Sequence, residues 1–144
     1  MMRREDWPER LREYFEAAEK RPFSWGNHNC CHFAAGAVVA QTDVDPTACF
    51  TGTNIRGRVS AYKRVRAFAG GGVRELTAKI SEDLGMDEVV PAMAGRGDIV
   101  CLEIEGCDAL GVVDLNPRNA RFLLPERGLV RLPVLKCVKA WKVE

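Results

Sequence analysis

The stretch from Phe23 to Ala40, FSWGNHNCCHFAAGAVVA, constrains the fold more than any other part of the sequence. From about Cys30 to Gln41 it predicts a helix with small and apolar residues around most of its circumference. A helix without a polar face is buried inside a domain, so other elements must cover it on several sides. The side chain of Asn29 can cap the first turn of this helix.

Cys30 falls in the first turn of this predicted helix. The unpaired backbone N–H groups and the positive end of the helix dipole favour a thiolate there, which predicts a nucleophilic Cys30. A base is then needed, and the only two histidines, His28 and His32, lie in the same stretch. Residues two apart on a helix point about 200° away from one another, which disfavours His32. His28 in the lead-in turn is the candidate substitute base.

Composition excludes several classes of protein. A net charge of +1 gives no electrostatic case for nucleic-acid or membrane binding. No apolar run approaches the roughly 20 residues that span a bilayer, and the N-terminus lacks the apolar core of a signal peptide, so a cytoplasmic location is expected. The six cysteines are then expected to be thiols. Without a CxxC pair, no metal and no cofactor is predicted.

The first part of the chain, about residues 5–90, has helical periodicity. A helix is expected from Asp6 to Lys20, with Asp6 and Glu9 forming a capping box. Two more helices are expected from Val59 to Ala69 and from Val73 to Leu84, separated by three glycines. Residues between the second and third helices are expected to form an irregular loop.

After Pro91 the pattern alternates, which indicates strands. Five short apolar runs are separated by turn residues: Asp98 to Glu103, Leu110 to Leu115, Ala120 to Leu124, Leu129 to Leu132 and Cys137 to Val143. Short connections favour antiparallel neighbours, so residues 97–143 predict a five-stranded meander. Helices followed by strands give an α+β fold, with residues 1–144 as a single domain.

These features together resemble the NlpC-type cysteine peptidases of the papain-like group. In that family the helix opens with Asp-Cys, matched here by Asn29-Cys30. The family's first strand begins with Gly-Asp, matched by Gly97-Asp98, and its second reads His-Val-Gly-Ile, aligned with Ala109 to Val112. The resemblance implies an NlpC-like, papain-like half-barrel with Cys30 at the position of the nucleophile.

The sequence resembles an uncharacterised phage and prophage branch of this group more closely. The shared features are the early amphipathic helix, the lead-in from Pro22 to Gly26, the cysteine-rich helix start and a final strand with Ala140-Trp141. The resemblance implies a protein partner, for example a phage structural or assembly protein in tail assembly. It also implies a peptide-like ligand, and either a cytoplasmic location or incorporation in a phage particle.

The position of the family's catalytic histidine is occupied by Ala109, which cannot accept a proton. One hypothesis is therefore a non-catalytic protein that acts by interaction. The other is an active thiol hydrolase, peptidase-like or amidase-like, with Cys30 as nucleophile and His28 as base. Trp25, Asn29 and Asp98 are candidate binding residues. Zinc binding by the histidines and a cysteine, and a purely structural role for the cysteines, are further alternatives.

Overall fold

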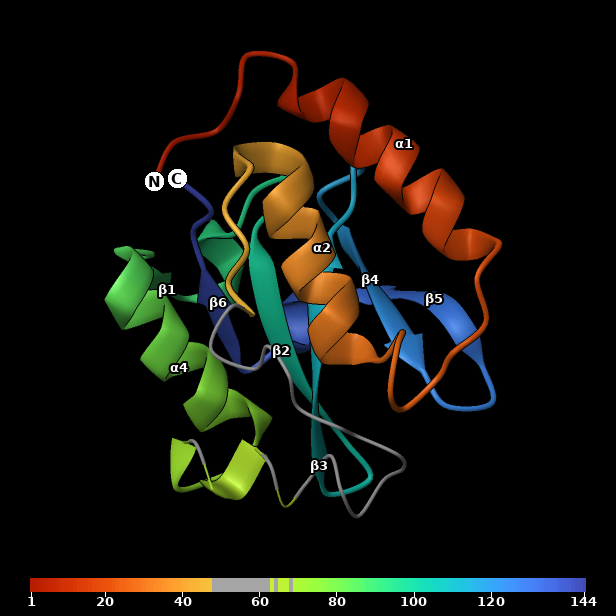
Figure 1. Ribbon diagram of the computed structural model, residues 1–144, viewed down its shortest axis with the longest axis vertical. Helices are drawn as coiled ribbons and strands as arrows, with labels where there is room; N and C mark the ends of the chain where they lie inside the picture. The colour runs from red at the N-terminus through yellow and green to blue at the C-terminus, as the bar shows by residue number, and fades with distance from the viewer. Residues whose placement is uncertain (48–62, 64, 68) are drawn as a thin grey trace.

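The computed structural model describes residues 1–47, 63, 65–67 and 69–144. Within these residues, helices lie over one face of a six-stranded antiparallel sheet (Figure 1). The predicted α+β class is confirmed. No helix in the described part of the chain is long and apolar enough to cross a membrane.

In the described part of the chain, the helices whose two ends are defined are α1 (Trp7–Glu19), α2 (Cys30–Thr42) and α4 (Val73–Leu84). Their bounds agree with the predicted ones to within one residue. The predicted capping box of α1 is wrong, because the side chain of Asp6 makes no capping bond and instead accepts a hydrogen bond from Arg4 Nε at 3.0 Å. The predicted helix over residues 59–69 and the loop before it fall largely outside the described residues. Residues 63, 65–67 and 69 are helical.

The sheet has the strand order β1-β6-β2-β3-β4-β5. The strands are β1 (Glu88–Val89), β2 (Ile99–Ile104), β3 (Cys107–Val113), β4 (Asn119–Leu124), β5 (Gly128–Pro133) and β6 (Lys139–Trp141). Strands β2 to β5 form the expected meander. The prediction of a five-stranded meander is wrong in its count and in the place of its last strand.

The last strand, β6, pairs with β2 rather than with β5. After β5 the chain makes a 3-10 turn, η3 (Val134–Lys136), and returns to the opposite edge of the meander. This crossing buries Val134 and Cys137 and places Trp141, 1% exposed, under the helices. Strand β1, only two residues long, adds to the free edge of β6 and is too short to show any periodicity.

Alternation along the strands divides the core into two clusters, one on each face of the sheet. The cluster beneath the helices includes Ile99, Cys101, Leu110, Val112, Leu123 and Trp141 together with residues of α1 and α2. The cluster on the other face includes Val100, Leu102, Ala109, Val113, Phe122 and Ala140. Helix α2 lies over the middle of the sheet, between α1 and α4, and packs against α1, β3 and β4, as its lack of a polar face predicts (Figure 1).

Asp98, fully buried at the start of β2, joins the two ends of the chain. One carboxylate oxygen lies 3.2 Å from Arg3 and accepts from Val143 N, and the other lies 2.6 Å from Lys142 and accepts from Gly95 N. The termini accordingly lie side by side (Figure 1). The candidate binding residue Asp98 is thus occupied by structural contacts.

We predict that Asp98→Asn lowers the free energy of unfolding by about 3 kcal/mol, because it leaves two partly buried cations and two backbone amides without the buried charge that they share. Urea denaturation of the purified protein measures this change. Asp43→Asn is the matched control, since Asp43 also pairs with two cations, Arg4 and Arg10, but is about half exposed. Equal losses in the two variants would contradict the prediction.

Candidate functional site

The start of α2 is fixed by Asn29. Its Oδ1 accepts a hydrogen bond from His32 N at 3.0 Å, and its own N–H donates to His32 Nδ1 at 3.4 Å. The Asn29 amide nitrogen also donates to the carbonyl of Trp25 at 2.7 Å, which ties the lead-in turn to the helix. This reciprocal cap places Cys30 at the first helical position, as the sequence predicts.

Cys30 and Cys31 lie side by side in the first turn of α2. Interaction with the Cys31 thiol, helped by the backbone N–H groups of Leu110, Cys31 and Cys30 and opposed by burial, lowers the pKa of Cys30 to about 7. Interaction with Cys30, together with burial, raises the pKa of Cys31 well above its ordinary value. Of the two thiols, Cys30 therefore loses its proton first.

The amide of Leu110 reaches the sulfur because of the sheet register. Pairing between β3 and β4 covers Gly111 to Val113 and stops before Leu110. On the other side, Leu110 is paired with Cys101 of β2, whose carbonyl accepts from Val138 at 2.8 Å. The N–H and C=O groups of one residue in an antiparallel strand point to the same side of the strand. Because the Cys101 carbonyl points toward Val138 and away from β3, Cys101 and Leu110 do not exchange hydrogen bonds. The Leu110 N–H is left for Cys30.

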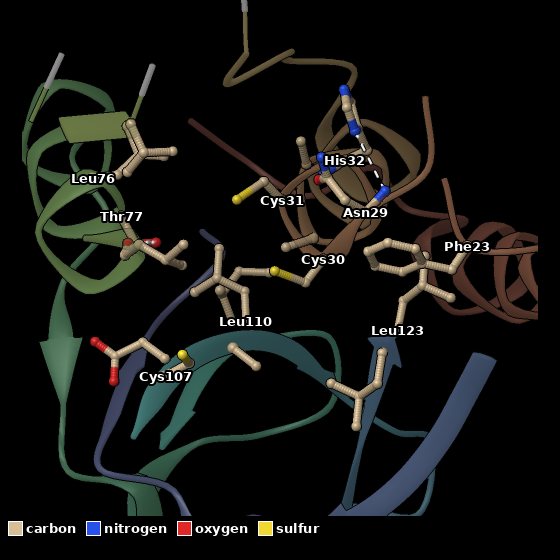
Figure 2. Close-up of a pocket in the computed structure, with 18 of the residues that line it drawn as sticks. Phe23, Asn29, Cys30, Cys31, His32, Leu76, Thr77, Cys107, Leu110 and Leu123 are labelled. Atoms are coloured by element: carbon tan, nitrogen blue, oxygen red, sulfur yellow. Dashed lines mark hydrogen bonds between the residues drawn. The ribbon is translucent and has the colours of Figure 1, made fainter. Parts of the chain in front are cut away.

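A cleft of about 1100 Å³ lies beside this thiol, between α2, α4 and the ends of β3 and β4. In Figure 2 the sulfur of Cys30 lies over Leu110, and that of Cys31 points toward α4. Much of the wall is apolar, with Phe23, Leu76, Ile80, Met86, Leu110 and Leu123. The candidate binding residues Trp25 and Asn29 also line the cleft.

Neither histidine donates to or accepts from the Cys30 sulfur. His32 uses Nδ1 for the cap, and its ring points away from the sulfur in Figure 2. His28 is 4% exposed and lines a separate, smaller cavity beside α1. Burial, with the nearby charge of Arg21, lowers the pKa of His28 below its ordinary value. The structure does not bring His28 and Cys30 together.

The resemblance to NlpC-type peptidases aligns Ala109 with their catalytic histidine. In the structure, Ala109 belongs to the core cluster on the sheet face opposite Cys30. The β3 side chains on the helix face are those of Asp108, Leu110 and Val112. Asp108 is paired with Arg74 at 2.8 Å. The side chains of Ala109 and Cys30 are thus not brought together, although Ala109 borders the cleft next to Leu110.

A family profile described as "Domain of unknown function (DUF6950)" matches residues 2–143, nearly the whole chain. The chain belongs to this family. No curated protein matches the sequence. Among the described residues of this family member, no group of three or more His, Cys, Asp or Glu side chains could hold a metal ion.

Two contributors to the site were missed at the level of sequence. A free cysteine in a buried helix, such as Cys31, predicts a small hydrophobic residue with a structural role, yet its interaction with Cys30 separates the pKa values of the two thiols. The signal available in the sequence is that Cys31 directly follows a cysteine at the start of a predicted helix. The Leu110 amide has no sequence signal, because its availability depends on where the β3–β4 pairing stops.

We predict that alkylation of Cys30 by iodoacetamide rises through a midpoint near pH 7, because its pKa is lowered to about 7. Cys31→Ala removes a donor and should move the midpoint toward the ordinary thiol value of about 8.5. Cys31→Ser keeps a donor and should move it less. Peptide mass mapping separates Cys30 from the other cysteines.

His28→Ala is the control for this measurement, because His28 lies in the other cavity. An unchanged midpoint is expected. A shift in His28→Ala, or none in Cys31→Ala, would contradict the assignment of Cys31 as the dominant donor.

Proposed function

We propose that this protein uses an NlpC-like scaffold to bind an extended, peptide-like segment of a partner protein in the thiol cleft without cleaving it. By the sequence resemblance, the partner is a phage structural or assembly protein, for example in tail assembly. The protein then acts in the cytoplasm or within a phage particle.

One observation carries the proposal: neither imidazole is placed at the Cys30 sulfur, because His32 Nδ1 takes part in the Asn29 cap and His28 lines a separate cavity. Cleavage of an amide requires a group that protonates the leaving nitrogen in the transition state. Backbone amides do not release protons, and Cys31 is a poor acid because its pKa is raised. The cleft therefore favours binding over hydrolysis.

The cleft suits an extended peptide in size and chemistry. A volume of about 1100 Å³ exceeds what a few side chains need, and its walls combine aliphatic and aromatic residues. The described lining residues include three carboxylates, Glu105, Asp108 and Glu126, and one guanidinium, Arg127. This balance favours a neutral or basic apolar segment over an acidic one.

An active thiol hydrolase is the second candidate, supported by the lowered pKa of Cys30. A nucleophile at a helix N-terminus, next to free amides that can stabilise an oxyanion, is the first half of such an enzyme. The position of His28 beside α1 weighs against it as the base. Turnover of a peptide substrate would decide for this candidate.

We predict that Cys30→Ser protein binds apolar, neutral or basic octapeptides with a change in tryptophan fluorescence. Trp25 lines the cleft and meets Phe23 edge-on, with ring centroids 4.9 Å apart. Trp25→Ala removes this reporter, so its binding is measured by isothermal titration calorimetry and should be weaker about tenfold, or about 1.4 kcal/mol, as expected for an aromatic contact of an interface. Trp7→Phe, a matched control outside the lining, should leave the affinity unchanged.

Mass spectrometry of the same peptides incubated with the wild-type protein should show no cleavage. Repeated turnover of any peptide would replace this proposal by the hydrolase. Absence of binding across the peptide set would refute the cleft as a peptide site.

A further inference from the structure

The smaller cavity, of about 320 Å³, is lined by α1, by α2 and by the chain that connects them. Part of its wall consists of small and apolar residues from the two helices: Ala17, Ala18, Ala35, Gly36 and Val39. Three basic side chains also line it: Arg21, His28 and His32. A concave site that combines an apolar wall with a few convergent polar groups is typical of small-molecule binding.

The basic residues are held in place by hydrogen bonds of the connecting chain. The backbones of Ser24 and His28 exchange two hydrogen bonds, each of 2.9 Å. Arg21 Nη2 donates to the carbonyl of Asn27 at 3.0 Å. The cap at the start of α2 fixes the ring of His32. The three side chains are therefore arranged before any ligand arrives, which lowers the entropic cost of binding one.

The cap also determines the donor that His32 offers. Its Nδ1 accepts a hydrogen bond from Asn29 N at 3.4 Å, so a neutral ring carries its proton on Nε2. Figure 2 shows that the ring points away from the Cys30 sulfur. Since His32 also lines the smaller cavity, its Nε2–H is a donor for a ligand bound there.

His28 is the polar group that this cavity leaves without a partner. Its side chain is 4% exposed, and its Nε2 is buried with no hydrogen-bond partner among the described residues. A buried nitrogen without a partner is unfavourable. Burial and the charge of Arg21 also lower the pKa of both histidines. A negative charge in the cavity would offset these effects by stabilising a protonated His28.

The only carboxylate among the described lining residues is that of Asp45. It is exposed and accepts hydrogen bonds from the Thr47 N–H at 2.8 Å and from the Thr47 hydroxyl at 2.6 Å. The acidic group is thus engaged in its own turn, while the basic groups keep free donors. The cavity consequently favours an anionic ligand over a cationic one.

We propose that the cavity between α1 and α2 binds a small organic carboxylate with an apolar body. The carboxylate accepts from Arg21, whose planar guanidinium matches its geometry, and from His32 Nε2. The apolar body lies against the wall of small residues. A multiply charged anion such as phosphate would leave this wall unused. The site is separate from the thiol cleft and does not depend on the proposed peptide binding.

The test is proton NMR of the full chain, which has only two histidines and therefore two sets of imidazole signals. His28→Gln assigns the signals. Benzoate is the probe, and benzamide is its uncharged match. Benzoate should shift both sets of signals to saturation, and benzamide should not. At saturating benzoate the pKa of His28 should rise by about one unit, because an opposite charge favours the protonated ring.

Three variants locate the bound benzoate. Arg21→Gln should weaken binding about tenfold, as expected when a charge-assisted hydrogen bond is lost. Arg12→Gln, on the same helix, is the matched control and should leave binding unchanged, because Arg12 pairs with Glu16 outside the cavity. Ala17→Phe should abolish binding, since Ala17 is an exposed lining residue and the larger side chain occupies the cavity.

Equal affinities for benzoate and benzamide would overturn the proposed recognition of charge. Phosphate or acetate binding as tightly as benzoate would overturn the role of the apolar wall. Shifts confined to His32, which survive Ala17→Phe, would place benzoate in the thiol cleft and refute the second site. Absence of any shift at millimolar benzoate would also refute it. Peptide binding by Cys30→Ser is measured separately, so either proposal can fail while the other stands.

Discussion

The candidate site depends on the unpaired backbone amides at the start of α2. A helix leaves its first N–H groups without carbonyl partners, and Asn29 accepts from only one of them, that of His32. The amides of Cys30 and Cys31 lie in the same turn as the Cys30 side chain and help to lower the pKa of its thiol. Because this donor set is backbone, its geometry is as fixed as the helix itself. The rest of the fold serves the site by holding α2 in place.

Helix α2 is held at both ends by buried polar contacts. At the C-terminal end of α2, the side chain of Gln41 is fully buried. It donates to the carbonyls of Ala37 and Gly97 and accepts from Arg3 Nε at 2.9 Å. Gly97 has φ +81°, and a Cβ there would collide with the Gln41 side chain, so this contact requires glycine. The adjacent Asp98 cluster ties both chain termini to the same point. The sulfur at the other end consequently meets β3 in one fixed register.

Much of this fold is local and was predictable from the sequence. The bounds of α2 and α4 follow from an Asn cap, a glycine stop and helical periodicity, all of which act within a few residues. The place of β6 and the existence of β1 depend on pairing across the sheet, which short-range patterns do not specify. The sequence resemblance aligns Ala109 with a residue that would face Cys30. In the structure the two side chains are not brought together, for a related reason. Order along the chain does not fix the face of a strand, and Ala109 points into the second core.

The chemistry of the site follows from separating two tasks that an imidazole performs together in a cysteine peptidase. One is to stabilise the thiolate, and here Cys31 and the backbone amides take it over. The other is to deliver a proton to the leaving group, which requires a group that changes its protonation state near neutral pH. Backbone amides and a thiol with a raised pKa do not meet that requirement. A thiol with a lowered pKa and no such acid beside it is suited to binding rather than to amide cleavage, as proposed for this cleft.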